Sequence, residues 1–159
     1  MFPAVTFRIP TLWRVQGRIE DVADILSQPE EFPRWWGDVY LAVTTTDKGD
    51  AQSIGQTVAV RSKGWLPYQL NWQGRLIENH MPTSWTVEAT GDLVGRGVWT
   101  LTQKIEIAEI HYDWSVRSDR LLFRVLAPTM KWFMVSNHRW AMAKGEMGLQ
   151  AELFRRSKR

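Results

Sequence analysis

The sequence Asn137-His138-Arg139-Trp140-Ala141-Met142-Ala143-Lys144-Gly145-Glu146 lies at the centre of residues 118–159, which we expect to form one long helix. On a helical wheel of about 100° per residue, one apolar face gathers within about 60° of Asn137. Its members are Leu126, Met130, Phe133, Trp140, Ala141, Gly148 and Ala151. Burying each large side chain of such a face contributes about 1.5–3 kcal/mol, so the helix needs a partner surface.

Two polar residues, Asn137 and Lys144, fall inside this apolar face. A buried amide or ammonium is costly unless it finds a partner, so both residues indicate a site. Lys144 lies about two turns beyond Asn137, and we expect its amine to reach out to the mouth of a cavity. A buried Lys144 would instead have a lowered pKa, and Schiff-base chemistry would become an alternative.

Composition indicates one globular domain over residues 1–159. The chain is 44% hydrophobic and has ten Trp, and Trp side chains commonly pack in cores or line ligand cavities. It has no Cys, which excludes disulfides, a thiolate metal site and a Cys nucleophile.

The charge and the ends of the sequence bear on its partners. The net charge of +3 owes much to Arg155, Arg156, Lys158 and Arg159, a basic helix end that is usually just solvated. Neither a leader-like start nor about 18 consecutive apolar residues is present. We therefore expect a cytoplasmic protein that has no nucleic-acid partner and no stable membrane insertion.

The chain before the long helix reads as one strand, two short helices and six strands. Residues 5–16 loosely alternate, residues 17–26 have helical spacing, and a second short helix follows Pro29 and stops near Gly37. The six strands are expected at residues 39–46, 55–62, 68–77, 84–90, 97–106 and 109–117. Short turns between them imply antiparallel neighbours.

Alternation along these six strands assigns a shared apolar face. Its predicted members are Val39, Leu41, Val43, Val58, Val60, Tyr68, Leu70, Trp72, Leu76, Trp85, Val87, Ala89, Trp99, Leu101, Gln103, Ile105, Ile110, Tyr112, Trp114 and Val116. The opposite face is mostly polar. These patterns predict an α+β helix-grip fold, in which a curved seven-stranded antiparallel sheet wraps around the long C-terminal helix and two short helices follow strand 1.

The sequence resembles the START-like (SRPBCC) superfamily, and within it the polyketide cyclase/dehydrase-type bacterial proteins. The resembling stretches are Trp13-Arg14-Val15 with Glu20-Asp21-Val22, Phe32-Pro33-Arg34-Trp35-Trp36, residues 91–97, and residues 137–146. The resemblance implies a hydrophobic ligand cavity between the sheet and the long helix. The predicted ligand-binding residues are Trp36, Tyr68, Trp72, Trp85, Trp99, Gln103, Tyr112, Trp114, Phe133, Asn137 and Trp140.

Other site chemistries find little support in the sequence. The three His form no HxxxH or HExxH pattern, so we expect no metal, and Gly91, Gly95 and Gly97 do not match GxGxxG, so we expect no nucleotide cofactor. No Ser lies in a GxSxG elbow, and the carboxylates fall mainly on the polar face.

Two functions stay open. The preferred one is binding or carriage of a hydrophobic, lipid-like or aromatic molecule. The alternative is a polyketide cyclase/dehydratase-like enzyme in which Tyr112, Gln103 and Asn137 position the substrate, because a neutral amide and phenol are weak acid–base catalysts.

A second apolar stripe lies on the opposite side of the helix wheel. Val135, Met142 and Leu149 recur every seven residues, and Leu153 continues the line. If the sheet grips the Asn137 face, this stripe looks outward and offers a homodimer contact.

Overall fold

The structure, a computed structural model, describes residues 5–65, 69–118 and 127–159. Seven strands form a single antiparallel sheet in the order β1-β7-β6-β5-β4-β3-β2. The elements in chain order are β1 (Val5–Gln16), α1 (Ile19–Leu26), η1 (Pro29–Glu31), α2 (Phe32–Trp35), β2 (Tyr40–Asp47), β3 (Thr57–Lys63), β4 (Gln69–His80), β5 (Ser84–Gly91), β6 (Val94–Lys104), β7 (Ile107–Ser118) and α4 (Ala127–Ser157).

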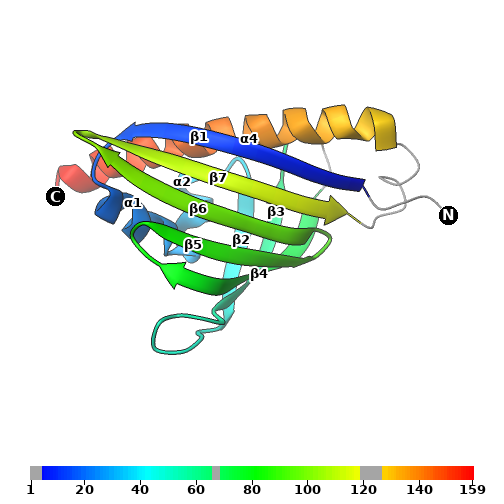
Figure 1. The fold of residues 1–159 in the computed structure, drawn as a ribbon, viewed down its shortest axis with the longest axis horizontal. Coiled ribbons are helices and arrows are strands. Elements are labelled where there is room, and N and C mark those ends of the chain that lie inside the picture. Colours follow the sequence, from blue (N-terminus) through cyan, green and yellow to red (C-terminus); the bar gives the residue numbers. More distant parts are fainter. Residues whose placement is uncertain (1–4, 66–68, 119–126) are drawn as a thin grey trace.

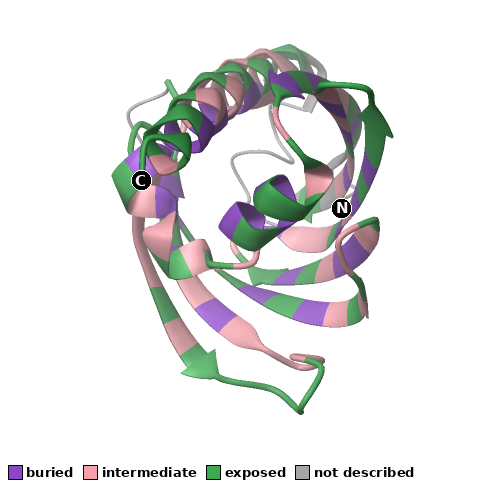
Figure 2. Ribbon diagram, turned by 90° about the vertical axis from the view of Figure 1, so that its left-hand side faces the viewer, coloured by how far each residue is buried: buried purple, intermediate pink, exposed green. Residues whose placement is uncertain are grey.

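The helix-grip fold expected from the sequence is confirmed. Helix α4 runs along β1, and the sheet curls away from that edge through β7, β6 and β5 to β2 (Figure 1). Seen end-on, the sheet bends around an interior that the helices close (Figure 2). The predicted long helix begins later than expected, because Ser118 belongs to β7 and residues 119–126 lie outside the described part of the chain.

Alternation along the strands produces the interior, as predicted. In β4, Leu70 and Leu76 are buried, while Gln69, Asn71 and Arg75 beside them are exposed. The register places Trp85 opposite Trp99, and Trp99 opposite Tyr112, so large aromatic side chains from three neighbouring strands share one face. Such cross-strand aromatic pairs stabilise a sheet by about 0.2–1 kcal/mol each.

A β-bulge corrects the predicted face of the second strand. The pairing shifts between Tyr40 and Ala42, so Tyr40 and Val43 both reach the interior and Leu41 is the extra residue. Strict alternation had placed Leu41 inside and left Tyr40 out. A bulge adds one residue to one strand of a pair and thereby changes which side chains point inward.

The turn between β6 and β7 corrects a second prediction. Ile105 was expected on the apolar face, but it lies in this turn, is 95% exposed and has a φ of 56°. The hairpin is tighter than the sequence suggested, and β7 already begins at Ile107.

The buried face of α4 differs from the predicted one. Met142, Leu149 and Leu153 are buried in the main core, and Val135 packs against a second, smaller core group. The prediction that this stripe looks outward is therefore wrong, and the stripe is not free for the homodimer contact. Among the described side chains of α4, the large apolar ones that are exposed are instead Trp132, Met147 and Phe154.

Two glycines explain why α4 turns this side inward. A Cβ on Gly145 would come 2.5 Å from Trp36 and 2.7 Å from Trp13, and one on Gly148 would collide with the carbonyl oxygen of Trp35. Only a helix face without side chains at these two positions lies this close to the indoles. Apolar residues occur nearly all round α4, so the hydrophobic pattern does not single out one buried face. The close contacts at the two glycines determine the orientation of the helix instead.

A buried carboxylate fastens the end of α4 to the short helices. Glu152, 3% exposed, accepts two hydrogen bonds from Arg34 at 2.8 and 2.9 Å and further ones from Arg155 and Arg156. Arg156 also bonds Asp24 of α1 at 2.8 Å. Two of the basic residues predicted to be merely solvated are thus part of an ion-pair cluster. Hydrogen bonds from Arg34 first, and then from Arg155 and Arg156, hold the pKa of Glu152 well below its ordinary value.

Candidate ligand cavity

Two adjoining cavities occupy the interior between the sheet and the helices. The larger, about 320 Å³, lies between the sheet and the segment that runs from Leu26 to Phe32. The smaller, about 110 Å³, lies beneath α4. The larger one alone reaches the lower end of the size range of small-molecule sites, about 300–1,000 Å³.

Five aromatic residues line both cavities and form the boundary between them. They are Tyr40, Trp72, Trp99, Tyr112 and Trp114. The ring of Tyr112 stacks on Trp99 with centroids 4.1 Å apart and on Trp114 at 5.8 Å, and Trp85 extends this row from the far side of Trp99 at 5.9 Å. The interior is thus lined by a row of stacked aromatic rings contributed by β5, β6 and β7.

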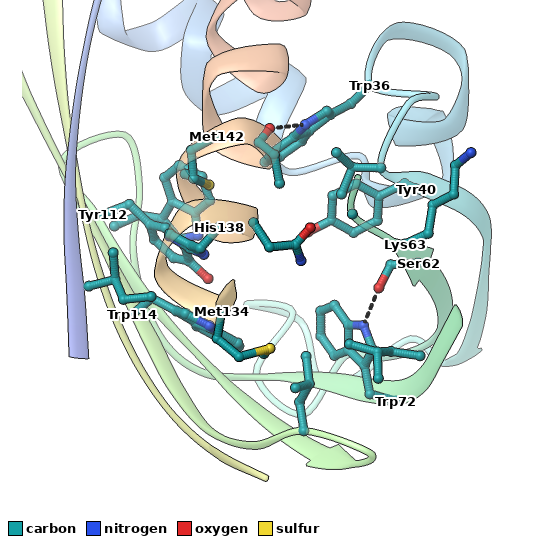
Figure 3. A pocket seen from close by; sticks show the side chains of 18 residues that line it. Trp36, Tyr40, Ser62, Lys63, Trp72, Tyr112, Trp114, Met134, His138 and Met142 are labelled. Atoms are coloured by element: carbon teal, nitrogen blue, oxygen red, sulfur yellow. Dashed lines mark hydrogen bonds between the residues drawn. The ribbon is translucent and has the colours of Figure 1, made fainter. Parts of the chain in front are cut away.

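Hydrogen bonds fix two of the indoles that line the smaller cavity (Figure 3). The Trp72 Nε1–H donates to Ser62 Oγ at 3.0 Å, and the Trp36 Nε1–H donates to the carbonyl oxygen of Ala141 at 2.9 Å. The second bond joins the end of α2 to α4. A buried indole N–H needs such a partner, so both rings have a fixed orientation.

The two tyrosines of the boundary lack a hydrogen-bond partner among the residues that the structure describes. Burial raises the pKa of both the Tyr40 and the Tyr112 phenol, and a charge on Tyr40 would raise that of Tyr112 further. Both phenols are therefore neutral O–H donors at physiological pH. Tyr112 lies against the backbone of Gly97, where a Cβ would come 2.5 Å from the Tyr112 Oη.

His138 of α4 faces the same row of rings. Its imidazole lies nearly parallel to the Tyr112 ring with centroids 6.4 Å apart, and its Nε2 is 3.4 Å from Thr11 Oγ1. Burial lowers the pKa of His138 to about 4, so the imidazole is neutral at pH 7. A neutral imidazole carries one donor and one acceptor nitrogen, and it therefore adds an adaptable polar group to the smaller cavity.

The structure brings most of the predicted ligand-binding residues to the two cavities. In addition to the four predicted residues of the boundary, Trp85 lines the larger cavity, and Trp36 and Asn137 line the smaller one. Tyr68 lies outside the described residues.

Three predicted site residues lie elsewhere. Gln103 is at the end of β6, where its side chain bonds the backbone of Gly17, Ile19 and Ile105. Phe133 packs between Trp132 and Trp65, and Trp140 packs against the main core without lining either cavity. The expectation that these three line the cavity is therefore wrong. For Gln103, alternation gave the correct side of the strand, but the strand extends beyond the cavity at that point.

The two polar residues that the sequence placed on the apolar face of α4, Asn137 and Lys144, both have interaction partners. Asn137 Oδ1 accepts a hydrogen bond of 2.8 Å from the backbone N–H of Trp65, so its amide joins α4 to the chain after β3. The Lys144 amine lies 3.8 Å from Asp38 and 5.8 Å from the centre of the Trp140 ring. Its side chain is 39% exposed, and it lines neither cavity. This position does not favour Schiff-base chemistry.

Among the polar cavity residues that sequence reasoning missed are Tyr40, Ser62 and His138 of the smaller cavity. Tyr40 reaches the interior only because of the bulge in β2. Ser62 was simply not singled out as a polar residue among apolar neighbours. His138 stands next to Asn137, but the predicted helix face placed it about 100° away from the centre.

The described part of the chain holds no candidate metal-binding cluster and no candidate membrane-spanning helix. Within it, no three His, Asp or Glu side chains gather in a way that suits a metal ion. No helix in the same part is both long and apolar enough to span a bilayer.

Comparison with known proteins identifies the fold. No family model matches the sequence, and no curated protein is similar to it. Among solved structures, the Zhui aromatase/cyclase from Streptomyces sp. R1128 aligns over 96% of this chain and 96% of its own, with a TM-score of 0.74 and 12% identity. A START superfamily protein from Mycobacterium smegmatis aligns over 93% and 97% respectively, with a TM-score of 0.74 and 10% identity.

A third similar structure is a point mutant of norcoclaurine synthase from Thalictrum, in complex with a transition-state analogue. It aligns over 99% of each chain, with a TM-score of 0.62 and 13% identity. These comparisons confirm the START-like helix-grip fold that the sequence stretches indicated. At such low identity the likeness concerns the fold, since one fold supports many functions.

Proposed function

We propose that this chain, as a single domain, binds a hydrophobic small molecule, lipid-like or aromatic, in the two adjoining cavities. The observation that carries the proposal is the row of aromatic rings along a cavity of about 320 Å³. Apolar pockets with a few placed polar groups are the usual form of small-molecule sites. The cytoplasmic location expected from the sequence stays a prediction.

Native mass spectrometry of the protein purified from its own host tests the proposal directly. We expect a retained small molecule, released on denaturation. A second test uses an environment-sensitive apolar fluorophore, whose emission rises when it enters a dry cavity. Absence of both a retained molecule and any fluorophore binding would contradict the proposal.

A matched pair of variants locates the binding. Val87 lines the larger cavity, whereas Val98 of the neighbouring strand β6 lies on the outer face, between the buried positions 97 and 99. Val87→Phe should fill part of the cavity and weaken fluorophore binding. Val98→Phe adds the same side chain outside the cavity and should leave binding unchanged.

A cyclase/dehydratase-like enzyme is the second candidate. It is favoured by the neutral imidazole of His138 beside the Tyr112 phenol, since these groups together both accept and donate hydrogen bonds to a bound substrate. The Zhui aromatase/cyclase shows that this fold hosts such an activity. Gln103, which the sequence analysis also expected to position the substrate, does not line either cavity and is not part of this candidate site. Recovery of the bound molecule chemically unchanged after prolonged incubation with the protein supports a carrier. Recovery of a chemically altered product supports the enzyme.

A further inference from the structure

We infer that the ligand is a planar aromatic ketone, whose carbonyl oxygen accepts hydrogen bonds from the phenols of Tyr40 and Tyr112 and whose ring system occupies the larger cavity. This inference rests on the proposed function and adds the chemical class and orientation of the ligand.

The two phenols reach the same space from distant strands. Tyr40 belongs to β2, at one end of the sheet order, and Tyr112 belongs to β7, next to the other end. Because the sheet curls, both side chains line both cavities. Figure 3 shows them on opposite sides of the smaller one. A ligand that occupies both cavities therefore contacts both tyrosine side chains.

These hydroxyl groups favour an acceptor on the ligand. Within the described part of the chain neither phenol has a hydrogen-bond partner, and a polar group buried without one is costly. Both are protonated at physiological pH and therefore act as donors. A carbonyl oxygen satisfies them, whereas a hydrocarbon leaves them unpaired.

The remaining lining disfavours a cationic ligand. No Asp or Glu is among the described residues that line either cavity, so an ammonium group would enter without a counter-charge. An unpaired charge in a buried site is far more costly than an unpaired neutral group. Amines are therefore poor candidates, and neutral oxygenated molecules are better ones.

The larger cavity suits a flat ring system. Apolar side chains from the short helices and the sheet line it, including Phe32, Leu76 and Val87. Along one wall the rings of Trp85, Trp99 and Tyr112 lie within about 25° of parallel to their neighbours in the row. These rings stack on one another, so a planar aromatic ligand lying on the wall gains edge-to-face contacts that a flexible acyl chain does not.

The test compares two probes of nearly identical shape, 9-fluorenone and fluorene, by isothermal titration calorimetry. We expect the wild-type protein to bind fluorenone about tenfold or more tightly than fluorene. Tyr40→Phe and Tyr112→Phe keep the rings, and each should lower this preference about threefold to tenfold, the value of one hydrogen bond. The double variant should bind both probes alike.

Thr100→Val is the matched control, because Thr100 is exposed on the outer side of β6 and loses its hydroxyl at nearly constant volume. Equal binding of the two probes by the wild type would overturn the inference and leave the proposed function standing. A preference that survives in the double variant would also overturn it. Binding of neither probe would contradict this inference, whereas the proposed function would then depend on the mass-spectrometric result. If a Tyr variant fails to fold, the wild-type preference still decides.

Discussion

Gly145 of helix α4 lies directly on the Trp36 indole, and a Cβ at this position would come 2.5 Å from Trp36 Cζ2. Trp36 is 2% exposed and donates its N–H to Ala141 on the same helix. Helix α4, which covers the smaller cavity, therefore packs directly against the end of α2. The glycine at position 145 allows the close approach, and one hydrogen bond joins the two elements. This contact fixes how far α4 stands from the sheet.

We predict that Gly145→Ala destabilises the protein. Alanine normally stabilises a helix interior by about 0.5–1 kcal/mol relative to glycine. Here the new methyl group meets two buried indoles, and such overpacking costs about 1–3 kcal/mol. Chemical denaturation should show a net loss. Ala143→Gly, at an exposed position of the same helix, is the control and should lose only the helix-propensity difference. A Gly145→Ala variant more stable than the wild type would show that the helix shifts freely.

The sequence predicted the sheet and the order of elements well, because strand alternation is a direct consequence of burying one face. It predicted the orientation of α4 badly, since the helix has apolar residues on several sides and Gly145, which packs on two indoles, carries no hydrophobic signal. The cavity residues follow the same division. Trp72, Trp99 and Tyr112 were found from alternation, while Tyr40 depends on a bulge and His138 on the helix rotation, neither of which has a local sequence signature.

Asn137 provides a prediction in which the structure reverses the sequence argument. As an unpartnered amide it would be replaced by Leu without loss. Its Oδ1 instead accepts the Trp65 N–H at 2.8 Å, so we expect Asn137→Leu to cost about 0.5–1.5 kcal/mol in unfolding free energy. Asn137→Asp retains an oxygen acceptor and should preserve this bond. Unchanged stability in Asn137→Leu would show that water replaces the amide at no cost.

Glu152 should contribute stability that acid removes. Its side chain is 2% exposed and is bonded by three arginines, so Glu152→Gln should cost on the order of 2–3 kcal/mol. The folded pKa lies below the ordinary value of 4.5, hence the contribution is complete above about pH 4.5 and declines as the pH falls further. Denaturant titrations at pH 7 and pH 3 should show a smaller difference between wild type and variant at pH 3. Glu20→Gln, in an exposed pair with Arg18, should change stability by less than about 1 kcal/mol.

His138 should make the fold sensitive to acid in a higher pH window. Its folded pKa of about 4 lies below the ordinary value of 6.5 because burial disfavours the imidazolium. Between these two values the unfolded chain binds more protons than the folded one, so the free energy of unfolding falls as the pH is lowered from about 6.5 to about 4. His138→Phe keeps a flat ring against Tyr112 and cannot be protonated. Its unfolding free energy should change less than that of the wild type across this window.

The control for His138 is His111→Gln, because His111 is exposed on the outer face of β7. Denaturant unfolding at half-unit steps from pH 7 to pH 4 should give parallel curves for His111→Gln and the wild type, and a flatter curve for His138→Phe. Bound fluorophore provides a second readout, since protonating an imidazole inside the smaller cavity adds an unpaired charge and should release an apolar ligand only as the pH approaches the folded pKa of about 4. A His138→Phe curve parallel to the wild type would mean that water reaches the imidazole, either directly or after a shift of α4. The cavity beneath the helix would then be more hydrated than its aromatic lining indicates.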